Sequence, residues 1–108
     1  MSLPEQTSFP HAPHAWSIDQ TQQIASDEGI ELTDGHWSVI RGLQEYFAKH
    51  EFPKARELTD ALNEMYHAKG GMKSLYLLLP KGPVAQGCRL AGITPPAGSV
   101  DLSFGSVM

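Results

Sequence analysis

The sequence predicts an all-α protein, a small bundle of about five helices with a flexible C-terminal arm and at most a minor β-hairpin. Apolar residues recur every three or four positions in several segments, which is the period of a helix with one buried face. Glycine and proline stand between these segments and at both ends of the chain. With 108 residues, 41% of them hydrophobic, the chain can build one core.

Composition divides the chain into three expected parts. Residues 1–15 are rich in proline, serine and histidine, and we expect a flexible lead-in. The periodic segments lie within residues 16–93, which should form one helical domain. Residues 94–108 contain proline, glycine and serine with few core-forming side chains, so they should form a mobile arm whose base begins near Lys81.

The first helix is expected from Trp16 to Glu28. Ser17 or Asp19 can cap its start, and Gly29 can end it. Its narrow apolar stripe consists of Ile18, Ile24 and Ala25.

Two longer amphipathic helices follow. Thr33 should cap the second helix, which ends near His50, and Pro53 suits the first turn of the third, which ends before Gly70. The buried stripes are expected to be Trp37, Ile40, Leu43 and Phe47 in the second helix, and Leu58, Ala61, Leu62, Met65 and Tyr66 in the third.

The remaining apolar segments are short. Residues 74–79 are almost continuously apolar, and their periodicity does not separate a strand from a buried helix. Residues 83–91 predict a short helix that turns Val84, Cys88 and Leu90 inward and ends at Gly92.

Charge is unevenly distributed. The net charge is −4 and the pI about 5.6, which disfavours general nucleic-acid binding. No acidic residue occurs between Met65 and Val100, however, while Lys69, Lys73, Lys81 and Arg89 do. This third of the chain is either a cationic surface for an anionic ligand or acidic partner, or an ordinary solvated face.

The compartment expected from the sequence is the cytoplasm. The first 15 residues contain no continuous apolar run of the kind found in signal peptides. No stretch approaches the roughly 20 apolar residues of a membrane helix, so we expect no membrane contact. A single cysteine cannot form an intrachain disulfide.

Cys88 is the only thiol and the main candidate for chemistry. No phosphate-binding loop, nucleophile elbow or zinc-binding helix motif occurs, and we expect neither a metal nor a cofactor. Lys81 and Arg89 lie near Cys88 in the sequence, and cations favour the reactive thiolate. A free cysteine is also often buried as a small hydrophobe, and the spacing alone leaves both interpretations open.

Two motifs stand out in the sequence, namely EGIELT at 28–33 followed by His36 and Trp37, and LPKGPVAQGCRLAGITPP at residues 79–96. Both motifs, and their order, resemble those of the DsrC/TusE family. The resemblance covers roughly residues 15–100.

This resemblance implies a small helical sulfur-relay protein whose C-terminal arm carries persulfide sulfur on a cysteine. TusE-type members take part in tRNA 2-thiouridine formation. DsrC-type members resemble a gamma subunit of dissimilatory sulfite reductase and act with that enzyme. The implied partners are sulfur donor and acceptor proteins, which supply the catalysis, so a carrier is favoured over a stand-alone enzyme. Cys88 then corresponds to the upstream cysteine of the DsrC-type pair, with Lys81 and Arg89 as candidate binding residues.

The chain departs from this family pattern at Ser99, which stands at the position of the near-terminal carrier cysteine. A serine oxygen forms neither a persulfide nor a disulfide. The chain also continues from Asp101 to Met108, where family members usually stop just after that cysteine. Either Ser99 is an engineered substitution, or the chain is a paralogue without the carrier step.

Three functional interpretations follow. The first is a sulfur-relay protein that uses Cys88, and the second is a non-catalytic paralogue that binds or regulates the relay machinery. The third reads residues 33–50 and 53–69 as a helix-turn-helix, which the acidic side chains of its second helix disfavour. We therefore expect no direct DNA binding.

Overall fold

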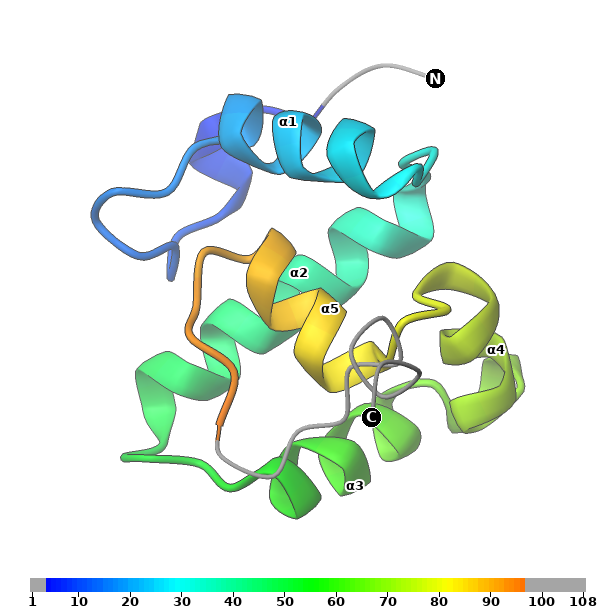
Figure 1. The fold of residues 1–108 in the computed structure, drawn as a ribbon. Coiled ribbons are helices and arrows are strands. Elements are labelled where there is room, and N and C mark those ends of the chain that lie inside the picture. Colours follow the sequence, from blue (N-terminus) through cyan, green and yellow to red (C-terminus); the bar gives the residue numbers. More distant parts are fainter. Residues whose placement is uncertain (1–3, 97–108) are drawn as a thin grey trace, which may run out of the picture.

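The computed structural model describes residues 4–96, and this part of the chain is all helical (Figure 1). Its α-helices are α1 (Ile18–Glu28), α2 (Asp34–Lys49), α3 (Ala55–Met65), α4 (Gly71–Leu78) and α5 (Pro83–Leu90), with short 3-10 helices at Gln6–Ser8 and His67–Lys69. The predicted all-α class with five helices is confirmed. Residues 74–79, left open between strand and helix, belong to α4 and its C-cap.

Helix α5 lies at the centre of the bundle, where it contacts each of the other four helices (Figure 1). It is only eight residues long, yet all of its residues except Arg89 are buried. A helix that is buried on all sides needs small residues at the positions where neighbouring helices pack closely against it. At Gly87, an added Cβ would lie 2.8 Å from Leu43 Cδ1 of α2. The Cys88 helix is therefore the core element of the fold and not the base of a separate arm at Lys81.

The predicted stripes form most of the core. Trp37, Ile40 and Leu43 of α2 are buried, and Phe47 packs against them at the edge. Leu58 and Leu62 of α3 and the following Tyr66 are buried as expected, and Ala61 is half-buried. Met65 is the error in the prediction, because it is 51% exposed and only its end lies against Gly42 of α2.

The predicted caps position α1 and α2. The Ser17 side chain accepts a hydrogen bond from the Gln20 N–H at 3.2 Å, and Gly29 ends α1 with φ +73°. Thr33 precedes α2, and its N–H donates to His36 Nδ1 at 3.0 Å. His36 Nε2 lies 2.6 Å from the Leu78 carbonyl oxygen, so this buried imidazole joins the start of α2 to the end of α4.

Within the expected flexible lead-in, the described residues 4–15 are attached to the domain through Phe9. Phe9 is 4% exposed and packs against Trp16 and Trp37, with ring centroids 5.0 and 5.9 Å apart. The Arg41 guanidinium stacks over the Phe9 ring and donates to the Ser8 carbonyl oxygen at 3.0 Å. One aromatic side chain thus supplies the apolar contact that the composition of this segment did not suggest.

Candidate functional site

Local sequence features place Cys88 in the last turn of α5. Pro83 occupies the first turn, where its missing N–H is not needed, and Gly82 before it has φ +116°. After the helix, Gly92 turns the chain with φ +78°, and an added Cβ there would lie 2.7 Å from the Trp16 ring. The Trp16 Nε1–H and the Thr21 hydroxyl both donate to the Leu90 carbonyl oxygen, at 2.9 and 2.6 Å. These contacts fasten the end of α5 to α1.

Cys88 is sealed in the hydrophobic core. Its relative exposure is 0%, and it belongs to the cluster of buried side chains that includes Val39, Leu43 and Leu79. Burial raises the pKa of the Cys88 thiol to about 12, and the Arg89 charge opposes this rise only in part. Of the two interpretations left open for Cys88, the folded domain therefore favours the buried cysteine over the thiolate, because loss of hydration outweighs the nearby positive charge.

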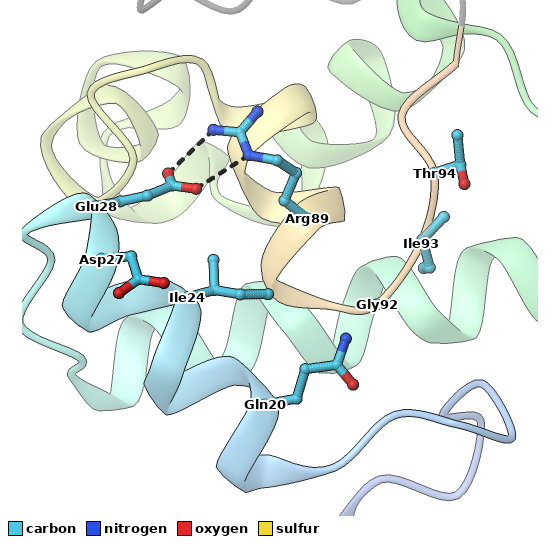
Figure 2. A pocket seen from close by; sticks show the side chains of 8 residues that line it. All are labelled: Gln20, Ile24, Asp27, Glu28, Arg89, Gly92, Ile93 and Thr94. Atoms are coloured by element: carbon cyan, nitrogen blue, oxygen red, sulfur yellow. Dashed lines mark hydrogen bonds and ion pairs between the residues drawn. The ribbon is translucent and has the colours of Figure 1, made fainter.

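Arg89 is paired with a carboxylate from α1, as Figure 2 shows. Its Nε donates to Glu28 Oε2 at 3.1 Å and its Nη2 to Glu28 Oε1 at 3.0 Å. Both side chains are largely shielded from solvent. The sequence neighbourhood of Cys88 contains no acidic residue, so this bidentate pair across 61 positions was not anticipated.

Gln86 and Lys81 complete the same polar cluster. Gln86 is fully buried, its Nε2 donates to Glu28 Oε1 at 2.7 Å, and its Oε1 accepts from the Lys81 N–H at 3.1 Å. Burial raises the pKa of the Glu28 carboxyl, but the hydrogen bonds from Arg89 and Gln86 and the charges of Arg89 and Lys81 outweigh it, so the net pKa is lowered. Of the two candidate binding residues, Arg89 is thus paired directly with the partly buried Glu28, while Lys81 contributes its backbone N–H to Gln86 and a nearby positive charge.

A shallow pocket of about 380 Å³ opens beside this cluster (Figure 2). Gln20, Asp27 and Glu28 line it from α1, and Arg89, Ile93 and Thr94 line it from the end of α5 and the segment that follows. Glu28 and Gln86 were not predicted as members of this site. Glu28 lies in the motif at residues 28–33 and Gln86 in the motif at 79–96, and this position within the motifs was the signal that could have identified them.

Ser99 lies outside the described residues, and the structure gives it no position. Residues 94–96 of the expected arm are described, and Thr94 and Pro96 line a second hollow at the corner between α2 and α3. Within residues 4–96 no group of three or more metal-ligating side chains comes together. The helices of this part of the chain are also too short or too polar to cross a membrane.

The helix-turn-helix interpretation finds no support in α3. Its exposed positions combine basic and acidic side chains, namely Arg56, Asp60, Asn63 and Glu64. The acidic members would face DNA phosphates unfavourably.

Comparison with known proteins identifies relatives. The family model described as DsrC like protein matches residues 4–100. Sulfurtransferase TusE of Salmonella typhimurium is 39% identical over 83 residues, which cover 75% of this chain and 76% of that protein. The Sulfurtransferase TusE homolog of Haemophilus influenzae is also 39% identical, over 76% of this chain and 77% of its own. The NMR structure of Allochromatium vinosum DsrC superposes with a TM-score of 0.66 at 34% identity, over 84% and 86% of the two chains.

Proposed function

The chain belongs to the DsrC-like family, and from this premise we propose that it docks onto the donor and acceptor proteins of a sulfur relay. Membership of this family supports a sulfur-relay role. The two specific settings that we propose are tRNA 2-thiouridine formation and sulfite reductase-linked sulfur metabolism, which correspond to the TusE-type and DsrC-type relatives. Such a relay would operate in the cytoplasm.

The burial of Cys88 is the observation that favours docking over carrying. A thiol with a pKa of about 12 is ionised in only about one molecule in 10⁵ at pH 7, and a sulfur acceptor needs the thiolate. The side chain is also fully covered, so a donor persulfide has no approach to it in the folded domain. By the resemblance, the second carrier position holds Ser99, whose hydroxyl cannot hold a persulfide. We therefore propose a binding or regulatory role within the relay.

A carrier role for Cys88 is the second candidate, favoured by its place near the end of α5. Cys88 is followed by only two further residues of that helix, so opening its last turn would expose the thiol. The opened thiolate would take the outer sulfur of a donor persulfide, and the donor would leave as a thiol. Such opening must break the contacts of Arg89 with Glu28 and those of Leu90 with Trp16 and Thr21. Residues 94–108 would then act as the arm that reaches the partner.

Sulfur loading separates the two candidates. The full-length protein, Cys88→Ala and Ser99→Cys are each incubated with glutathione persulfide, and their masses are measured. Docking predicts that the wild type gains no sulfur while Ser99→Cys does, because only the variant carries a second thiol besides the buried Cys88. A gain in the wild type that Cys88→Ala abolishes would instead establish Cys88 as the carrier.

Binding measurements test the docking role itself. Calorimetric titration of the full-length chain against a tRNA-thiolation acceptor complex, and separately against a dissimilatory sulfite reductase, should give saturable binding to one of them. A persulfide-free TusE-type protein should compete for the same site. Failure to bind either complex would contradict the docking proposal, whatever the loading experiment shows.

A further inference from the structure

A partly apolar groove lies at the corner between α2 and α3, away from the Cys88 cluster. It has a volume of about 580 Å³. Phe47, Phe52 and Pro53 contribute its apolar surface, and His50, Glu51 and Lys54 its polar edge. Thr94 and Pro96 line it as well, and Figure 1 shows the segment after α5 running toward this corner.

Phe52 is the most unusual residue of this corner. Its side chain is 87% exposed, whereas most large apolar side chains of the domain are buried. Its backbone adopts φ +51°, a left-handed conformation that is unfavourable for residues other than glycine, asparagine and aspartate. The fold therefore presents an aromatic ring to solvent beside an apolar groove, which is a feature of binding surfaces.

We propose that this groove binds the chain's own C-terminal segment, residues 97–108. Pro96 lines the groove, so the segment starts at its rim. The segment contains a single charged side chain, Asp101, and its apolar residues are Ala97, Val100, Leu102, Phe104, Val107 and Met108. An extended chain advances about 3.3 Å per residue, so Leu102 and Phe104 can reach every wall of the groove.

The short connection favours this occupant. A tether of a few residues gives an effective local concentration on the order of millimolar, so weak apolar contacts suffice. Asp101 can pair with Lys54 at the groove's polar edge, which also carries the acidic Glu51. Ser99 lies between Pro96 and the binding residues, so occupancy would hold position 99 against the domain. This inference is independent of the proposed sulfur role.

The first test uses the full-length chain with its native cysteine. Amide chemical shifts are compared between the wild type and Leu102→Ser/Phe104→Ser, with Ser103→Ala/Ser106→Ala as the matched control. We expect the double apolar substitution to shift the amides of Phe47, Phe52 and Lys54 and to leave those of α5 unchanged, while the control shifts none of them. Unchanged corner amides in the apolar variant would overturn the proposal.

The second test locates the segment directly. A spin label on Ser103→Cys, in a Cys88→Ala background, should broaden the amides of Phe52 and Lys54, and Phe52→Ala should abolish the broadening. An isotope-labelled chain without the spin label is then mixed with a spin-labelled chain of natural isotope content. Broadening in this mixture would mean that a second copy fills the groove, and it would overturn the assignment to the chain's own segment.

Discussion

Helix α5 and the α2–α3 corner differ in the solvent exposure of their most distinctive side chains, Cys88 and Phe52. Cys88 carries the strongest motif in the sequence, yet it is completely buried and its thiol pKa is raised to about 12. Phe52 lies in no recognised motif, yet it is held in solvent by a left-handed backbone. The motif around Cys88 therefore marks residues that build the core and tie it to α1, and a motif residue need not be a reactive one.

The contrast follows from what surrounds each residue. Helix α5 contacts four helices, so every small or apolar residue on it is constrained by packing. The corner has one covered side, formed by Phe47 and the buried Pro53, and one side open to solvent. Reactions and partners accordingly have access to the corner, while α5 is accessible only after local opening.

The largest expected effect is protection of the Cys88 thiol. Alkylation by iodoacetamide at pH 8 should be at least about 10³-fold slower in the folded protein than in denaturant, because the reaction requires opening of the core. Rates are measured by mass spectrometry, with Ser99→Cys as the control that adds a second thiol. Equal rates for the native and denatured wild type would show that Cys88 is accessible, and α5 would then not differ from the α2–α3 corner in accessibility.

The raised thiol pKa also sets the alkaline stability. Unfolding exposes a thiol that ionises near its ordinary pKa of 9.0, whereas the folded thiol stays protonated to about 12. The unfolded state therefore binds fewer protons in this window, and the free energy of unfolding should fall by up to about 1.4 kcal/mol per pH unit as pH rises above 9. Urea denaturation of Cys88→Ala should show a smaller decline over the same range.

The sequence predicted the local features of this fold well. Periodicity located the helices, and cap residues such as Ser17 and Gly29 located the ends of α1, because each of these signals depends on neighbours within one or two turns. The assignments that failed depend on distant contacts. The burial of Phe9 requires Trp37, and the neutralisation of Arg89 requires Glu28.

For the site, the resemblance indicated the segment around Cys88, and the structure shows what surrounds it. Proximity in sequence to Lys81 and Arg89 suggested a positive field around Cys88. The structure adds the desolvation of the thiol, which acts against a thiolate, and the Glu28 carboxylate, which pairs with Arg89. Neither is visible from spacing, because each depends on how α1 packs against α5.

The next effect concerns the pair that fastens α5. Glu28→Ala should lower the free energy of unfolding at pH 7 by about 2 kcal/mol, because it removes a carboxylate that accepts hydrogen bonds from both the partly buried Arg89 and the buried Gln86. Asp27→Ala, at the exposed neighbouring position, is the matched control and should change it by less than about 0.5 kcal/mol. Equal losses of unfolding free energy in the two variants would show that the Glu28–Arg89 pair does not specifically stabilise the packing of α5 on α1.

The same pair has a pH signature. The pKa of Glu28 is lowered in the folded protein from its ordinary value of 4.5, so its stabilisation is present at neutral pH. It should be lost as pH falls through the folded pKa, where the carboxylate becomes protonated. Glu28→Ala should therefore lose less stability than the wild type between neutral and strongly acidic pH, measured by urea denaturation.

A smaller effect tests how closely α5 is packed. Gly87→Ala should cost about 1–2 kcal/mol, because its Cβ would lie 2.8 Å from Cδ1 of the buried Leu43. Gly42→Ala is the matched control on α2, where the nearest atom is the end of the half-exposed Met65 side chain, which can move. Alanine also favours the helix, so Gly42→Ala should be neutral or stabilising in chemical denaturation. A loss as large as that of Gly87→Ala would contradict the difference in packing.

The smallest effect is expected at the corner itself. Phe52→Asn should change the free energy of unfolding by no more than about 1 kcal/mol, because the side chain is 87% exposed and asparagine tolerates a positive φ. The same urea titration used for Gly87→Ala provides the measurement. A loss above about 2 kcal/mol would mean that Phe52 supports the core as α5 does. A small change would mean that the Phe52 ring contributes little to stability. Stability would then not explain the unfavourable backbone conformation, and contact with a binding partner or segment would.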